Sequence, residues 1–229
     1  MAGFVVRRVL SIAEYRAQGA RLVAQAERLP REYAVGDGEP LRMAVLGDST
    51  AVGVGAGSLE ATLGYRVAKD RQARVTITNL GVSGVTLLDV VRDQLPNLTP
   101  GTTLVLVSAS ANDATHGTSR LALGNALEAL LEGFRSRGVQ AVVVTTTPNF
   151  RTTPALPWVV NRLFERRASA LTKAIREGAA RHPEVCIADL NQEGTLSEDQ
   201  YAADGFHPNA AGYAVWTEIV ERALGQARP

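Results

Sequence analysis

Short, continuous apolar runs that alternate with helical patterns constrain the fold of this chain more than any other sequence feature. The runs cover residues 41–46, 75–80, 104–107, 141–144 and 185–190. Four of the five are rich in valine or isoleucine, and each is followed by polar or glycine-containing residues and then by helical spacing. Continuous apolar runs are typical of strands that are covered on both faces. The alternation therefore predicts an α/β fold, a three-layer α/β/α sandwich around a five-stranded parallel sheet.

Helical spacing marks the segments between the strands and one segment before them. After the strands begin, it is clearest at residues 120–136, 159–181 and 209–226. Residues 11–29 show the same spacing, and Pro30 and the glycines that follow it then indicate a connecting loop. A chain of 229 residues fits one α/β domain. We therefore predict that residues 1–40 form a helix and linker packed on a main domain of residues 41–229.

The balance of charges argues against a nucleic-acid partner. The 24 basic and 23 acidic residues give a formal net charge of +1, without the basic stripe that a phosphate backbone attracts. No stretch approaches the roughly 18 apolar residues of a membrane-spanning helix. The N-terminus carries no apolar stretch of signal-peptide length before a small-residue cleavage site. We expect a cytoplasmic protein, and the sequence specifies no oligomeric state.

Metal, thiol and nucleotide chemistry find little support in the sequence. Cys186 is the one cysteine, and its apolar neighbours predict a small buried side chain in a strand. The three histidines are far apart and no zinc-binding spacing occurs, so we expect no metal site. Residues 53–57 contain three glycines but lack the spacing of dinucleotide-binding and phosphate-binding loops. A flexible segment that shapes a pocket explains these glycines better.

A serine follows the first apolar run directly, in the segment Gly47-Asp48-Ser49-Thr50. Ligands of open parallel sheets bind beyond the carboxyl ends of the strands, so polar residues at these ends are the candidates for chemistry. A serine at a strand-to-helix junction has an exposed hydroxyl, and amides of the new helix nearby can stabilise an oxyanion. On its own, the same segment also suits an ordinary helix cap.

A serine alcohol needs a base to take its proton, and His207 is the histidine in the most suitable setting. It lies three residues after Asp204, before a predicted helix. At this spacing the carboxylate can accept a hydrogen bond from the imidazole and fix its tautomer, which leaves the other ring nitrogen to face a serine. An isolated Asp-x-x-His segment more often consists of solvated loop residues.

Two further segments follow the second and third predicted strands. Residues 79–84 end in Gly84, where the backbone amide can approach a substrate closely. Residues 110–113 place the amide side chain of Asn112 after the most apolar strand. Either segment taken alone is also explained by turn chemistry.

Taken together and in order, these four segments resemble the four blocks of the SGNH/GDSL hydrolase family. Ser49 stands in the first block, Gly84 resembles the glycine of the second, and residues 204–207 match the last. The third block, usually Gly-x-Asn-Asp, begins here with Ser110, which leaves Asn112 in place but indicates altered backbone geometry beside it. No Gly-x-Ser-x-Gly elbow occurs, which disfavours the α/β-hydrolase fold.

The resemblance implies a flavodoxin-like fold and hydrolysis of a carboxylic ester through an acyl-enzyme. By position, Ser49 would attack the carbonyl, His207 would act first as base and then as acid, and Asp204 would orient His207. The amides of Ser49 and Gly84 and the Asn112 side chain would form the oxyanion hole. These groups complete the chemistry, so we expect neither a metal nor an organic cofactor.

The segment after the fourth strand is the candidate for a substrate-binding wall. It contains Phe150 and Trp158, either of which could contact an acyl chain, although both could simply pack against the next helix. We expect a small-molecule ester with a small or medium acyl group on an alcohol or sugar. Thioester cleavage and acyl transfer would use the same residues. A non-catalytic module that binds an acyl or glycan ligand on the same fold is the alternative of a different class.

Overall fold

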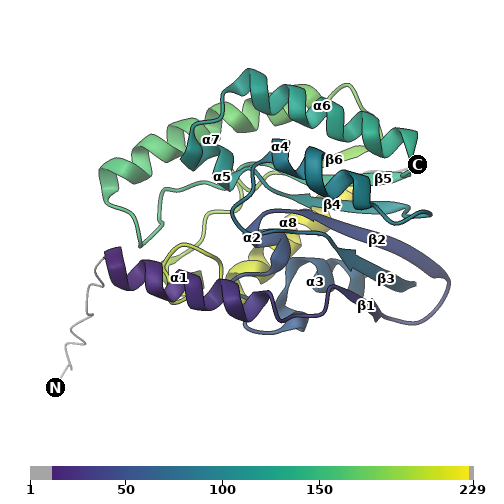
Figure 1. The fold of residues 1–229 in the computed structure, drawn as a ribbon, viewed down its shortest axis with the longest axis horizontal. Helices are drawn as coiled ribbons and strands as arrows, with labels where there is room; N and C mark the ends of the chain where they lie inside the picture. The colour runs from purple at the N-terminus through teal and green to yellow at the C-terminus, as the bar shows by residue number, and fades with distance from the viewer. Residues whose placement is uncertain (1–11, 227–229) are drawn as a thin grey trace.

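The computed structural model describes residues 12–226, which form one sheet covered by helices on both faces (Figure 1). The six strands are β1 (Glu32–Val35), β2 (Pro40–Gly47), β3 (Arg74–Asn79), β4 (Leu104–Ser108), β5 (Ala141–Thr145) and β6 (Val185–Ala188). Their order across the sheet is β1-β3-β2-β4-β5-β6, and all neighbours except β1 and β3 run parallel. The predicted three-layer α/β/α architecture is therefore confirmed.

The helices form two layers, which Figure 1 shows above and below the sheet. In chain order they are α1 (Ile12–Ala26), α2 (Ser49–Val52), α3 (Leu63–Lys69), α4 (Leu87–Asp89), α5 (Ala111–His116), α6 (Arg120–Ser136), α7 (Trp158–Ala179) and α8 (Ala210–Gln226). Helices α6 and α7 pack on each other over one face, and α3 and α8 cover the other. The long helices α6, α7 and α8 occupy the three segments in which the sequence shows the clearest helical spacing.

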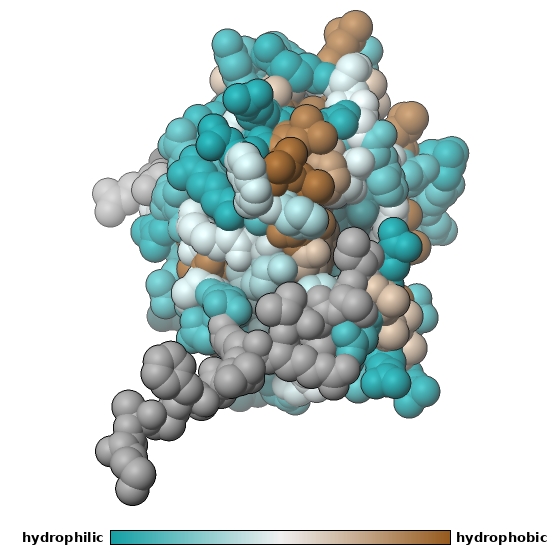
Figure 2. All heavy atoms as spheres, turned by 90° about the vertical axis from the view of Figure 1, so that its left-hand side faces the viewer, coloured by the Kyte–Doolittle hydropathy of each residue, from teal (hydrophilic) through white to brown (hydrophobic). Residues whose placement is uncertain are grey.

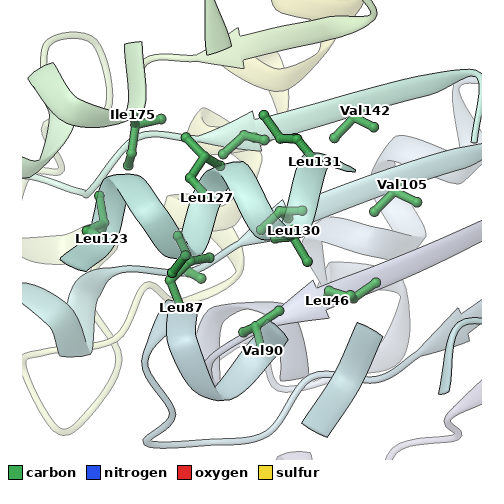
Figure 3. Close-up of a cluster of buried hydrophobic side chains, with 14 of the residues drawn as sticks. Leu46, Leu87, Val90, Val105, Leu123, Leu127, Leu130, Leu131, Val142 and Ile175 are labelled. Carbon is green, nitrogen blue, oxygen red and sulfur yellow. The ribbon is translucent and has the colours of Figure 1, made fainter. Parts of the chain in front are cut away.

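Each parallel strand contributes to two separate cores, because successive side chains of a strand point to opposite faces. Val105 and Val107 of β4 pack under α6 and α7, whereas Leu104 and Leu106 face α3 and α8. Figure 3 shows the first core, in which Leu127, Leu130 and other α6 side chains lie over the strands. Burial on both faces is the physical reason for the continuous apolar runs in the sequence.

The sheet has six strands rather than the five that we predicted, because β1 lies within the expected linker. Strand β1 pairs antiparallel with β3, from Glu32 opposite Thr78 to Val35 opposite Val75. It has four residues, of which only Val35 is buried. Its apolar run covers only residues 33–35 and is shorter than the runs by which the parallel strands can be recognised.

Helix α1 packs on the segment that follows Ser49. Ala26, with Leu22 and Val23, contacts Val52 and Val54 in a small apolar cluster. The helix begins at Ile12, and residue 11, at which the predicted helix starts, lies outside the described residues. The division of the chain at residue 40 stays a prediction. Within residues 12–226, no helix combines the length and apolar character that crossing a membrane requires.

Candidate active site

Ser49 is held at a sharp turn between β2 and α2. The turn starts at Gly47, whose φ of +139° suits glycine and where a Cβ atom would collide with the Ser108 carbonyl. The Asp48 N–H then donates to that carbonyl at 3.0 Å, and Asp48 Oδ1 accepts the Thr50 N–H at 2.9 Å. Asp48 therefore caps α2 and fixes Ser49 as its first residue.

His207 faces Ser49 across 158 positions of sequence. Its Nε2 atom lies 2.9 Å from Ser49 Oγ, and its Nδ1 atom lies 2.5 Å from Asp204 Oδ2. The loop that carries both residues leads into α8, where the Tyr213 hydroxyl donates to the Val54 carbonyl at 2.9 Å. This bond ties α8 to the segment after Ser49, so the fold brings together the three residues that the sequence predicted as a group.

Asp204 is a buried anion whose hydrogen bonds offset the cost of burial. It is 3% exposed, and its Oδ1 accepts the N–H groups of Phe206 and His207, each at 3.0 Å. Burial alone would raise the pKa of Asp204, but the hydrogen bond and charge of His207 and these two amides hold it below the ordinary value. Asp204 is therefore ionised at neutral pH and can hold the Nδ1–H tautomer of His207.

Two other carboxyl groups are buried close to the turns that carry Ser49 and Asn112. Asp48 is completely buried, and its Oδ2 has no hydrogen-bond partner among the described residues. Asp113 is 1% exposed, and its Oδ2 accepts the Leu87 N–H at 3.0 Å. Burial raises the pKa of both groups, although hydrogen bonds from Thr50 and Leu87 act in the opposite direction. Both side chains anchor backbone turns and neither lines the cavity described below.

The three predicted oxyanion-hole positions, Ser49, Gly84 and Asn112, line one cavity. Gly84 has a φ of +87°, and a Cβ atom there would meet nothing within 4 Å, so its backbone is open to the cavity. The Asn112 side chain donates from Nδ2 to the Val85 carbonyl at 2.9 Å, which fixes the orientation of its amide. An amide NH₂ has two N–H groups, so one remains to act as a donor.

Ser110 explains why glycine is usual at the first position of the third block. Its φ is +86°, and it is the one non-glycine residue with positive φ between residues 12 and 226. A non-glycine side chain in this region is strained by about 1 kcal/mol or more. The Ser110 hydroxyl lies 2.8 Å from the Thr147 hydroxyl, and this buried pair helps to hold the strained turn. Ser110 thus adopts a left-handed conformation that suits glycine, and its side chain ties the turn to the segment after β5.

The cavity at this end of the sheet has a volume of about 300 Å³ and a mostly apolar wall. Ser49 and His207 lie on it together with Phe150, Phe206 and Val23. The Phe150 ring centroid lies 6.1 Å from that of Phe206, so two aromatic rings form one side. Phe150 thus occupies the position that the sequence predicted for a wall residue.

Trp158 does not line this cavity, and its predicted place in the wall is wrong. It is 71% exposed at the first position of α7 and borders a separate groove with Arg151 and Arg162. The reason is the phase of the helix, since α7 turns Phe164 toward Phe150, with ring centroids 5.6 Å apart, and leaves Trp158 outside.

Val23 is a cavity residue that the sequence analysis missed. It lies on α1, whose inward face also brings Gly19 to the Asp204 side chain and Tyr15 to Gly205. The helical spacing of residues 11–29 predicts an apolar face, but not which part of the fold that face covers. No sequence motif marks Val23 as a cavity residue.

In the part of the chain that the structure describes, potential metal ligands do not cluster. Within residues 12–226, no group of three or more histidine, cysteine, aspartate or glutamate side chains is arranged to hold a metal ion. Cys186 is buried in β6, and burial raises the pKa of its thiol. The thiol is therefore neutral at physiological pH, as a packed core side chain.

Comparison with known proteins gives a consistent set of similarities. A model of the GDSL-like Lipase/Acylhydrolase family matches residues 45–215. The GDSL-like esterase Rv1075c of Mycobacterium tuberculosis is 28% identical over 203 residues, and the match covers 82% of this chain. The chain spans 62% of the length of that relative.

Solved structures share the fold. The lipase Lip_vut3 from a goat rumen metagenome superposes with a TM-score of 0.65 at 18% identity, covering 80% of this chain and 97% of that one. The protein TesA superposes with a TM-score of 0.64 at 22% identity, covering 82% of this chain and 99% of its own. At these identities the similarity concerns the arrangement of strands and helices.

Proposed function

The chain belongs to the GDSL-like lipase/acylhydrolase family, and from this premise we propose that it hydrolyses carboxylic esters through an acyl-enzyme formed on Ser49. The observation that carries the proposal is the line of three side chains in which His207 lies 2.9 Å from Ser49 Oγ and 2.5 Å from Asp204. A protein that only binds its ligand has no need of a serine paired with an oriented base.

Acylation begins with proton transfer from Ser49 to His207. Asp204 accepts the Nδ1–H of His207, so Nε2 carries the lone pair that takes the proton from Oγ. The serine oxygen then attacks the ester carbonyl carbon, and the carbonyl oxygen becomes an oxyanion. The ionised Asp204 stabilises the imidazolium that forms in this step.

The oxyanion is held by the Ser49 and Gly84 amides and by Asn112 Nδ2. Each such donor acts in a mostly apolar cavity, and removing one usually raises the barrier by about 3–4 kcal/mol. Collapse of the tetrahedral intermediate breaks the bond to the alcohol, which leaves with the proton from His207 Nε2. Water then attacks the acyl group with His207 as base, and the carboxylic acid and free Ser49 result.

The cavity supports a small or medium acyl group as the part of the ester that is bound. Its volume of about 300 Å³ is at the lower end of the range for ligand sites. Phe150, Phe206 and Val23 offer an apolar surface to a hydrocarbon chain, and Ser49 lies on the same wall. We propose that α1, through Val23, limits the length of that chain.

A fluorophosphonate probe tests the mechanism directly, because it reacts with an activated serine and leaves a mass that can be mapped. We expect the label on Ser49 in the wild type, no label in Ser49→Ala, and an unchanged label in the control Ser136→Ala, whose hydroxyl is exposed at the end of α6. Esters of 4-nitrophenol with increasing acyl length would then define the preferred substrate. A wild-type protein that is not labelled at Ser49 would refute the acyl-enzyme and favour a binding module.

A further inference from the structure

The first two turns of α7 expose large apolar side chains. Trp158, Val159 and Leu163 are 71%, 58% and 53% exposed, and they lie within six positions of one another. They are half of the exposed large hydrophobic residues in the described part of the chain. Scattered apolar side chains are normal on a surface, but a group such as this one marks a place where another surface binds.

These side chains share one arc of the helix with two arginines. Successive helical residues are about 100° apart, so Trp158, Val159, Arg162, Leu163 and Arg166 all fall within about 140° of the helix surface. The opposite arc carries buried side chains that pack on the sheet, among them Ala168, Leu171 and Ile175. Helix α7 therefore presents a mixed apolar and basic face to the outside.

The charge around this group is positive. Arg151, Arg162 and Arg166 border the groove beside Trp158, and Glu165 is the one acidic residue among the groove residues. The carboxylate of Glu165 is engaged by Arg151 Nε at 3.1 Å and by the Phe150 N–H at 2.9 Å. In residues 12–226, no ion pair forms with Arg162 or Arg166, which are exposed.

An α7 side chain that faces inward from the patch contacts the wall of the cavity. Phe164, between Leu163 and Glu165, turns inward and packs on Phe150, which lines the cavity. The segment that leaves the cavity at Thr153 reaches Trp158 five residues later. Figure 2 looks at the side of the molecule where α7 begins and shows apolar atoms grouped within polar surroundings. A surface bound here would therefore lie close to the site of the chemistry.

We propose that this α7 patch, formed by Trp158, Val159, Leu163, Arg151, Arg162 and Arg166, docks the protein on an anionic lipid surface. Apolar side chains on a basic helical face enter the boundary between headgroups and acyl chains, while the arginines remain with the anionic headgroups. Tryptophan favours this boundary because one part of its ring system is apolar and the other carries an N–H donor.

The positive charge of the α7 patch favours binding to an anionic lipid surface over binding to a second copy of this chain. A two-fold dimer through the patch would bring Arg162 and Arg166 of both copies together, neither of them ion-paired within residues 12–226, and like charges across an interface are unfavourable. An anionic lipid surface has the opposite charge and attracts each basic residue near it, strengthening binding by about fivefold per residue. This docking does not depend on the acyl-enzyme and can be measured without it.

Vesicle sedimentation with the full chain tests the proposal. We expect Ser49→Ala and the wild type to bind vesicles containing about 30% phosphatidylglycerol at least about tenfold more tightly than pure phosphatidylcholine vesicles, less tightly at high salt. Trp158→Ser/Leu163→Ser and Arg162→Glu/Arg166→Glu should each lose this binding by about tenfold or more. The control Leu121→Ser removes an apolar side chain that is 74% exposed on α6 and should bind as the wild type does.

A soluble short-chain ester separates docking from catalysis. The two patch variants and the Leu121→Ser control keep an intact Ser49 site and should hydrolyse it at the wild-type rate, so a loss of vesicle binding cannot come from unfolding. Equal binding to both kinds of vesicle, or none, would overturn the proposal. So would a wild-type dimer that becomes monomeric in Trp158→Ser/Leu163→Ser, because the patch would then be an interface between copies.

Discussion

Gln94 forms hydrogen bonds with the backbone of Gly47, the residue that starts the turn before Ser49. Its Oε1 accepts the Gly47 N–H and its Nε2 donates to the Gly47 carbonyl, each at 2.8 Å, and the side chain is 3% exposed. The carbonyl also accepts the Val82 N–H at 3.0 Å. Gln94 is therefore the partner of the Gly47 N–H in this structure, and Ser49 follows two residues later.

Replacing Gln94 with leucine keeps the side chain close to its original size but removes both hydrogen bonds. The Gly47 N–H is then buried without a partner, which costs about 1–3 kcal/mol, while the carbonyl loses one of two bonds worth about 1 kcal/mol. We expect Gln94→Leu to lose roughly 2–4 kcal/mol of unfolding free energy. For a chain of this length, that loss corresponds to a decrease in Tm of roughly 4–16 °C. Turnover should fall as well, because Ser49 is held by this turn.

Gln94→Glu tests the same two hydrogen bonds in a second way, because its effect on folding stability depends on pH. The ionised carboxylate can accept the Gly47 N–H but meets the Gly47 carbonyl with a like partial charge, whereas the protonated acid can donate to it as the amide does. The pKa of the carboxyl group that Gln94→Glu introduces should therefore lie above the ordinary glutamate value of about 4.3 in the folded state. A raised folded-state pKa means that stability is present below the unfolded pKa and is lost as pH rises through the folded pKa.

Urea unfolding at several pH values measures both effects. Relative to the wild type, Gln94→Glu should be least stable above neutral pH and should approach wild-type stability near pH 4. The control Gln140→Glu changes an exposed side chain and should follow the wild type throughout. A Gln94→Leu protein within about 0.5 kcal/mol of the wild type, or a Gln94→Glu deficit that does not vary with pH, would refute the role given to Gln94.

Three other predictions concern the catalytic residues and the cavity. Asn112→Ala should lower kcat by about 10²–10³-fold with little change in KM, and an effect on KM alone would argue against an oxyanion role. Asp204→Asn should lower kcat by about 10⁴-fold through the wrong His207 tautomer. Because hydrogen bonds lower the pKa of Asp204, its carboxylate stabilises the fold above the unfolded pKa of about 3.9, and the stability is lost as pH falls through the lower folded pKa. The difference in stability between wild type and Asp204→Asn should therefore shrink below about pH 4, and a constant difference would contradict this linkage. Val23→Trp should shift hydrolysis toward shorter acyl chains, whereas an unchanged chain-length profile would place the acyl group elsewhere.

The parallel strands and the polar residues after them could be predicted from the sequence because both follow from burial. Val105 and Leu106 of β4 face different cores, so the sequence around them is apolar without interruption. The carboxyl ends of parallel strands lie at one edge, which is enough to group Ser49 with Asn112 before any coordinates are known.

Features that depend on contacts between distant segments could not be predicted. Around Trp158, apolar residues lie on both arcs of α7, with Leu163 outward and Phe164 inward, so periodicity alone leaves the orientation of the helix open. Strand β1 is held by its hydrogen bonds to β3, and its apolar run of three residues is shorter than those of the parallel strands. Both misassignments arise at positions where tertiary packing, rather than the local sequence pattern, determines the structure.

The glycines after Ser49 show how packing between distant segments brings His207 close to Ser49. The segment that contains them was expected to shape a pocket, but none of its glycines lines the cavity. Gly55 has a φ of +90°, and a Cβ atom there would collide with the Pro208 carbonyl and press on Ala202. A residue without a side chain thus lets the segment after Ser49 touch the loop that carries His207. This contact holds the two segments together and thereby helps to set the 2.9 Å separation of His207 Nε2 and Ser49 Oγ.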